Sequence, residues 1–185
     1  MDLKKAFDKV PREFLFNILY RLGITGKIFR VIKDVYFNNK AEVLLGSHLS
    51  PEFDIQFGVM QGSKLGPLLF LLFINGLLNT LHKSGLAGKI DQLTISALGF
   101  ADDIVLISDS PSKLQSLIDL CLEWAKENQM EFNSSKCNVM VLNRSCKGLD
   151  FALDNKELEI VKSYKYLWSN FFYTTSNVVI FGIFF

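Results

Sequence analysis

The sequence has few of the residues from which disulfide frameworks and structural metal centres are built. Its three cysteines, Cys121, Cys137 and Cys146, include no pair at CxxC spacing, and His48 and His82 lie far from them. An odd, scattered set fits reduced intracellular thiols better than disulfides or a zinc site. We therefore expect no structural metal and an intracellular protein, and no targeting pattern favours the nucleus over the cytoplasm.

An excess of charge of one sign is also missing. Lysine and arginine number 20 against 19 acidic residues, so the formal net charge is +1. This balance argues against strong nonspecific binding to nucleic acid through overall charge. Residues 1–40 are more basic, with nine lysines and arginines against four acidic residues. That end fits a surface facing phosphates and fits an ordinary solvated surface equally well.

No apolar run is long and clean enough for a membrane span. The longest, Pro67 to Ile74 continuing to Leu78, is interrupted by Asn75 and Gly76 and is short for a bilayer. It predicts a buried helix and no membrane contact. The charged N-terminal residues do not resemble a signal peptide, and we find no internal repeat or Pro/Ser-rich linker. With 49% hydrophobic and 21% charged residues, the 185-residue chain is typical of one globular domain.

The order of the predicted elements favours a mixed α+β fold. Apolar residues at helical spacing predict four helices, over residues 11–22, 25–36, 66–83 and 110–125. Strand-like segments are predicted at residues 42–45, 52–57, 93–100, 104–108 and 137–142, with a small hairpin of 151–153 and 157–161 around Asp154-Asn155.

The most informative segment is GFADDIVLIS, residues 99–108, where Asp102 and Asp103 lie between two apolar strand-forming runs. Neighbouring anions repel, so a fold usually offsets such a pair with a cation or points it into water. Aspartate is also common in hairpin turns, because its side chain bonds nearby backbone amides. The pair alone therefore leaves both a metal site and a solvated turn open.

Two further segments carry chemistry. In DLKKAFDKV, residues 2–10, a carboxylate followed by lysines and a helix start can hold a cation near phosphate oxygens, although ordinary helix capping has the same composition. In GVMQGSKLGPLLF, residues 58–70, glycines permit close backbone approach and Gln61, Ser63 and Lys64 offer polar contacts. This loop lacks the GxxxxGK[ST] form of a phosphate-binding loop.

In this order, the three segments resemble motifs A, B and C of reverse transcriptases, and most closely those of non-LTR (LINE-type) retrotransposons, with group II intron enzymes next. The resemblance covers residues 1–167. It implies an α+β polymerase palm, an antiparallel sheet packed against helices with a ferredoxin-like core. It also implies RNA-directed DNA polymerase activity, in which dNTPs are added to a primer 3′-hydroxyl on an RNA or DNA template.

The resemblance also implies roles for individual residues. Asp2 and Asp102 would hold two Mg²⁺ ions, which Mn²⁺ could replace, with Asp103 in support. Phe7 matches the steric gate, an aromatic ring beneath the sugar; the alternative interpretation is an ordinary core phenylalanine. Asp8 has no clear chemical role, and we expect it to cap a helix or pair locally. By the resemblance, Leu3, Gln61 and Gly62 match residues that contact the nucleotide, and Lys64, Phe100 and Ala101 match residues that contact template or primer. Lys136 resembles the motif D lysine that donates a proton, and an ordinary turn lysine is its alternative.

Departures from the family pattern lie at both ends. The resemblance implies fingers before motif A and a thumb after the primer grip, and the sequence contains neither. The primer-grip motif begins at residues 164–167, but Trp168 stands where the family usually has glycine. Residues 168–185 are Phe-rich and uncharged, which suggests a sticky strand or anchor, or sequence foreign to the fold.

We therefore expect little or no polymerase activity from this chain alone, and its oligomeric state is left open. Two alternatives remain: a noncatalytic remnant that binds nucleic acid or protein, and a metal-dependent nuclease using the same carboxylates. The nuclease would leave the Gln-Gly loop and Phe7 unexplained.

Overall fold

The computed structural model describes residues 1, 3–37, 39–90, 92–141, 148–166, 169–172 and 181–184, with only the backbone described for residues 90, 164–166, 169–172 and 181–184. These residues form a mixed α+β structure, which confirms the predicted class. The chain divides into a first unit, Lys5–Phe73, and a second unit, Met1–Lys4 with Ile74–Phe185. The predicted domain boundary at residue 167 stays a prediction.

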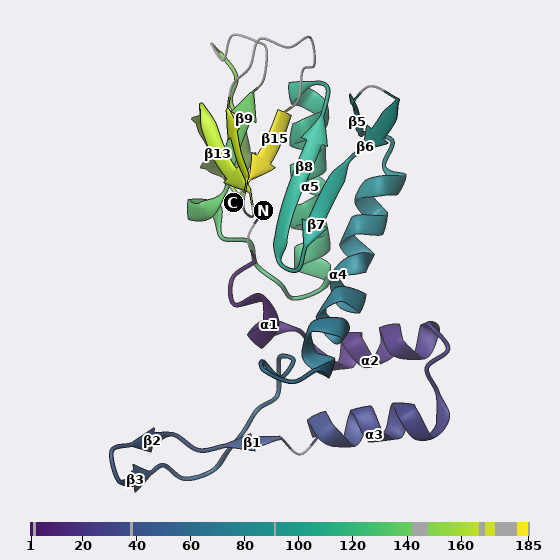
Figure 1. The fold of residues 1–185 in the computed structure, drawn as a ribbon, viewed down its shortest axis with the longest axis vertical. Coiled ribbons are helices and arrows are strands. Elements are labelled where there is room, and N and C mark those ends of the chain that lie inside the picture. Colours follow the sequence, from purple (N-terminus) through teal and green to yellow (C-terminus); the bar gives the residue numbers. More distant parts are fainter. Residues whose placement is uncertain are drawn as a thin grey trace. The chain divides into compact units, whose positions relative to one another are not determined.

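The first unit consists of helices and a two-stranded arm (Figure 1). The helices are α1 (Ala6–Lys9), α2 (Arg12–Arg21), α3 (Gly26–Phe37) and the first part of α4 (Leu65–Lys83). In the arm, β1 (Lys40–Ala41) pairs with β4 (Phe53–Asp54), and β2 (Leu44–Leu45) pairs with β3 (His48–Leu49). The predicted helices at 11–22 and 25–36 are confirmed, whereas the predicted strands are shorter than expected.

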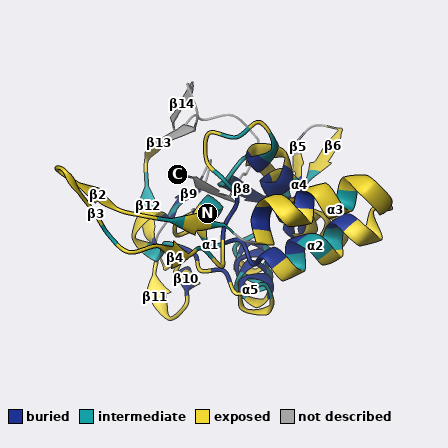
Figure 2. Cartoon of the chain, turned by 90° about the horizontal axis from the view of Figure 1, so that it is seen from below, coloured by how far each residue is buried: buried dark blue, intermediate teal, exposed yellow. Residues whose placement is uncertain are grey.

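The arm exposes apolar side chains. Leu44, Leu45 and Leu49 are 66%, 80% and 63% exposed, and Figure 2 shows the β2–β3 hairpin as exposed along its length. The sequence predicts strand-like segments at residues 42–45 and 52–57, and the pairing of two short strands alone leaves both faces of the ribbon open to solvent.

Helix α4 forms where the apolar run predicted it. The prediction that no segment is long and apolar enough for a membrane span is wrong by length and composition alone, because α4 has 19 residues and a mean hydropathy of 1.5, with 39% of its most apolar window buried. Its buried side chains follow helical spacing and are Leu69, Phe70, Phe73, Ile74, Leu77 and Leu81. Leu68 and Leu71 are about half exposed, so one face is packed and the other is open.

The second unit is built on a five-stranded sheet in the order β12-β9-β15-β8-β7 (Figure 1). Its strands are β7 (Ala97–Phe100), β8 (Asp103–Ser108), β9 (Asn138–Val141), β12 (Glu159–Val161) and β15 (Phe181–Phe184). All neighbours are antiparallel except β12 and β9. Short hairpins complete the unit: β5 (Gly88–Ile90) with β6 (Leu93–Ile95), β10 (Ala152–Leu153) with β11 (Lys156–Glu157), and β13 (Ser163–Tyr166) with β14 (Ser169–Phe172).

Strand β15 comes from the Phe-rich end of the chain. Its backbone pairs with β8 on one side and β9 on the other, in the register Gly182 with Ile107 and with Met140. Residues 181–184 therefore take part in the sheet that carries the Asp pair.

Helix α5 (Pro111–Glu127) packs against β8 and supplies much of the core of the second unit. The Ser110 side chain caps it by accepting from the Lys113 backbone N–H, and Pro111 occupies the first turn, as the sequence predicts. Cys121, on its inner face, and Cys137 are both buried. Burial raises the pKa of the Cys121 thiol to about 12, so this thiol stays protonated and unreactive at neutral pH.

Candidate functional site

The Asp pair lies at the tip of the β7–β8 hairpin, as the sequence predicts. Phe100 pairs with Asp103, which leaves Ala101 and Asp102 as a two-residue turn. Ala101, Asp102 and Asp103 are each partly exposed, and Phe100 is 61% exposed. The two interpretations of the pair are compatible here, because the residues form a turn and present carboxylates near solvent.

The turn holds one residue in a strained conformation. Ala101 has a φ of 54°, in the left-handed region that disfavours residues with a Cβ and costs roughly 1–2 kcal/mol. Positive φ at the first loop position is typical of tight two-residue hairpins, where glycine or asparagine is the usual residue. Such strain persists only when the surroundings impose it, and it is frequent at functional sites.

The donor chemistry of the turn fits a hard divalent cation. Carboxylate oxygens are the ligands that Mg²⁺ and Mn²⁺ prefer, and Asp102 and Asp103 supply them from adjacent positions. Among the described residues no group of three His, Cys, Asp or Glu side chains converges on one point. Asp2, the third predicted ligand, lies outside the described residues.

The neighbours of Asp2 in sequence both belong to the second unit. The Met1 amine donates to the carbonyl of Ile104, the residue that follows the Asp pair. Leu3 forms an antiparallel bridge with Phe132, and the residue as a whole is only 2% exposed. Its predicted contact with a nucleotide stays a prediction.

The predicted Gln-Gly loop belongs to the first unit and is fixed by close backbone approach. Gly58 has a φ of 86°, and a Cβ there would lie 2.7 Å from the Asp8 carbonyl oxygen. A Cβ on Gly66 would collide with the Met60 carbonyl oxygen. Only glycine fits at either end, because the loop lies close to Asp8 of the motif A segment at Gly58 and close to the start of α4 at Gly66.

Gln61 contacts an acidic residue rather than standing alone. Its Nε2 donates to Asp8 Oδ1 at 2.7 Å, and both side chains are exposed. The prediction of a local partner for Asp8 is wrong, because this partner is 53 residues away in sequence. Asp8 and Gln61 also line a hollow of about 350 Å³ beside residues 57–60. Gly62, with a φ of 81°, and Lys64 are exposed beyond it.

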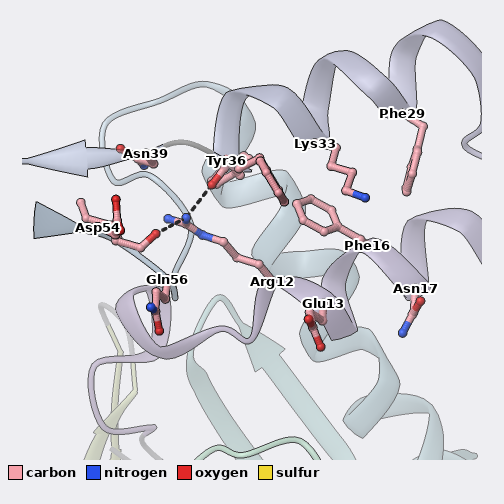
Figure 3. A pocket seen from close by; sticks show the side chains of 12 residues that line it. Arg12, Glu13, Phe16, Asn17, Phe29, Lys33, Tyr36, Asn39, Asp54 and Gln56 are labelled. Carbon is pink, nitrogen blue, oxygen red and sulfur yellow. Dashed lines mark hydrogen bonds between the residues drawn. The ribbon is translucent and has the colours of Figure 1, made fainter.

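Arg12 is buried beneath this loop at 8% exposure. Its Nε donates to the Gly58 carbonyl at 3.0 Å and its Nη1 donates to the carbonyls of Tyr36, at 2.7 Å, and Ile55. Figure 3 shows the guanidinium reaching between the end of α3 and the strand that leads to the loop. Burial lowers the pKa of Arg12, but a guanidinium stays charged at any pH a protein tolerates.

A larger hollow of about 620 Å³ lies beside Arg12 (Figure 3). Aromatic rings and both signs of charge line it, among them Phe16, Phe29, Lys33 and Asp54. The Arg12 guanidinium lies 5.2 Å from the centre of the Tyr36 ring, so stacking adds to the carbonyl contacts.

Phe7 is half buried and stacks on the buried ring of Phe70, with 4.4 Å between ring centres and 22° between planes. One face of the ring is therefore packed, as a core phenylalanine requires, while part of it stays accessible. The steric-gate prediction for Phe7 stays a prediction.

Lys136 ends the short 3-10 helix η1 (Ser134–Lys136) in the second unit and is exposed. This is the turn position that the sequence predicts, and its role as a proton donor stays a prediction. Within the first unit the structure brings Phe7, Asp8 and Gln61 to neighbouring positions; within the second it brings together Phe100, Ala101, Asp102 and Asp103.

Comparison with known proteins identifies the family. Residues 1–170 match the family model described as reverse transcriptase (RNA-dependent DNA polymerase). The chain belongs to the reverse transcriptase family. All three motif segments lie within the matched residues, as does Lys136.

Relatives of this reverse transcriptase chain come from non-LTR retrotransposons. It is 31% identical over 179 residues to the RNA-directed DNA polymerase from mobile element jockey of Drosophila funebris, covering 90% of this chain and 18% of that protein. It is 28% identical over 181 residues to the Pol polyprotein from the type-2 element R2DM of Drosophila melanogaster, covering 92% of this chain and 17% of that protein. The chain thus spans less than a fifth of the length of these relatives.

Sequence reasoning missed Arg12 as part of the site. A basic residue opening a helix is unfavourable beside the positive end of the helix dipole, and Arg12 follows directly after Pro11 at the start of α2. That conflict is a signal that the residue has another partner.

Proposed function

We propose that this chain contributes the palm of an RNA-directed DNA polymerase of the non-LTR type, which adds dNTPs to a primer 3′-hydroxyl on an RNA or DNA template. One observation carries the proposal: a strained two-residue turn presents adjacent carboxylates, in a chain whose residues 1–170 match the reverse transcriptase family.

Asp102 and Asp103, together with Asp2 by the resemblance, are the residues that would hold divalent metal. Bound Mg²⁺ would make the primer hydroxyl a better nucleophile and neutralise charge on the triphosphate and the leaving pyrophosphate. Around that site Gln61 and Gly62 would lie against the nucleotide, Phe7 would limit the sugar, and Lys136 would supply a proton to pyrophosphate. Phe100, Ala101 and Lys64 would contact primer or template.

Primer extension with an RNA template, a DNA primer, dNTPs and Mg²⁺ or Mn²⁺ tests the proposal. Asp102→Asn keeps the size of the side chain and removes its charge, so we expect it to lower incorporation by at least about 100-fold. Asp154→Asn is the matched control, because Asp154 occupies another hairpin turn of the second unit. Equal losses in both variants would contradict a specific role for Asp102.

Mn²⁺ binding, measured by water proton relaxation, gives a readout that does not need turnover. We expect Asp102→Asn and Asp103→Asn to weaken Mn²⁺ binding and Asp154→Asn to leave it unchanged. Template binding without incorporation, unaffected by either Asp change, would instead indicate a noncatalytic binding module. Metal-dependent cleavage of DNA without added nucleotide would indicate a nuclease.

A further inference from the structure

The Gln61 amide has a defined direction. Its Nε2 donates to Asp8 Oδ1 at 2.7 Å. An ionised carboxylate can only accept hydrogen bonds, so the NH₂ end of the amide must face Asp8. The Oε1 end of Gln61 consequently faces away from Asp8.

The backbone that leads to Gln61 is held by hydrogen bonds that do not involve the Gln61 side chain. Gly58 N–H donates to the Val10 carbonyl and Val59 N–H to the Phe7 carbonyl, both at 2.8 Å. Arg12 Nε holds the Gly58 carbonyl from the other side. The backbone segments that carry Asp8 and Gln61 are therefore fixed relative to each other. What can still change is the orientation of the Gln61 side-chain amide.

We propose that Asp8 is a positioning residue that orients the Gln61 amide with its carbonyl oxygen outward. A ligand at Gln61 then meets an acceptor, which favours an N–H or O–H of the base or sugar and disfavours phosphate oxygens. The nucleotide part of this inference rests on the proposed function, whereas the amide orientation does not.

The amide orientation is tested by NMR of the full chain. The Gln61 side-chain NH₂ signals are those missing from the spectrum of Gln61→Ala. Asp8→Asn offers both a donor and an acceptor and so lets the amide turn over. We expect the Gln61 signals to shift part of the way toward those of free glutamines in Asp8→Asn, where both amide orientations are populated, and to stay in place in Asp8→Glu, which keeps an acceptor-only carboxylate.

Asp34→Asn is the matched control, because Asp34 is an exposed aspartate on α3 of the same unit and its change removes the same charge. We expect it to leave the Gln61 signals unchanged. Unmoved Gln61 signals in Asp8→Asn would overturn the proposal. Since Asp8 and Gln61 are exposed, the melting temperature should change by no more than about 2 °C in either variant.

Kinetics test the consequence for the nucleotide. In primer extension we expect Asp8→Asn to raise the KM for dNTP about 3- to 10-fold with little change in kcat, as for one weakened hydrogen bond. In a Gln61→Ala background the same change should have no further effect, because Asp8 acts through Gln61. An equal KM increase in both backgrounds would overturn the proposal.

The two failures are distinguishable. If the wild-type chain neither incorporates dNTP nor binds Mn²⁺ through Asp102 and Asp103, the proposed function fails its test, and the Gln61 NH₂ signals alone decide whether Asp8 orients the amide. If incorporation occurs and the Gln61 signals do not depend on Asp8, the positioning role fails and the proposed function stands.

Discussion

Residues 58–62 of the first unit and residues 100–103 of the second unit keep their conformations by different means. The 58–62 loop depends on side chains elsewhere, since Arg12 holds the Gly58 carbonyl and Asp8 holds Gln61. The 100–103 turn depends on strand pairing, with Phe100 opposite Asp103 and Ala101 in a left-handed conformation. The loop should therefore be sensitive to remote substitutions, and the turn only to changes in its own backbone preference.

Substitution of Gly58 in the 58–62 loop is expected to have the largest effect on the free energy of unfolding. Gly58→Ala places a Cβ 2.7 Å from the Asp8 carbonyl at positive φ, and we expect a loss of about 4 kcal/mol in the free energy of unfolding. Gly62 has a similar positive φ but nothing within 4 Å of its Cβ position, so we expect Gly62→Ala to cost about 1 kcal/mol. Urea unfolding measures both, and equal losses would mean that close approach does not hold the loop.

Arg12 comes next in size. Arg12→Met fills similar space but removes the donor to the carbonyls of Tyr36, Ile55 and Gly58, which should cost about 2–3 kcal/mol. Hydrogen exchange should rise at the Gly58 and Val59 amides and stay unchanged in the β7–β8 hairpin. Arg21→Met, at an exposed position of α2, serves as control, with a change below about 0.5 kcal/mol. Faster hydrogen exchange in the β7–β8 hairpin of Arg12→Met would contradict the view that the turn does not depend on Arg12.

Substitution of Ala101 in the 100–103 turn is expected to have the smallest effect on stability, and the effect has the opposite sign. Ala101→Gly relieves the positive φ, so we expect stability to rise by about 1 kcal/mol. Ala97→Gly, in the strand β7 that leads into the turn, relieves no strain and should lower stability by about 0.5–1 kcal/mol. Thermal unfolding of the two variants should therefore move in opposite directions; a destabilised Ala101→Gly would show that the turn is not strained.

The helices and the Asp hairpin were predictable because their signals are local. Apolar spacing, Pro111 after Ser110 and the Asp-Asp turn each act within a few residues. The parallel pairing of β12 with β9 and the position of β15 between β8 and β9 were not predictable. Strand order depends on contacts between residues far apart in sequence, which no local pattern encodes.

Part of the candidate site was predictable for the same reason. Asp102, Asp103 and the glycines of the 58–66 segment are recognisable by residue type and spacing, and the structure shows where Gly58 and Gly66 need the absence of a side chain. The partnership of Asp8 with Gln61 spans 53 residues, and Arg12 bonds to carbonyls that every residue possesses. Neither the Asp8–Gln61 contact nor the Arg12 hydrogen bonds produce a recognisable pattern in the neighbouring sequence.

Arg12 has a consequence for how relatives of this chain can vary. Its partners are main-chain oxygens, so the side chains at positions 36 and 55 can change without losing these hydrogen bonds, whereas position 58 must stay glycine for lack of space. Methods that find contacts from pairs of positions changing together would register Asp8 with Gln61 and pass over Arg12. Arg12, which joins α2 to the end of α3 and to the segment leading into the 58–62 loop, would then show no covarying partner in such a map.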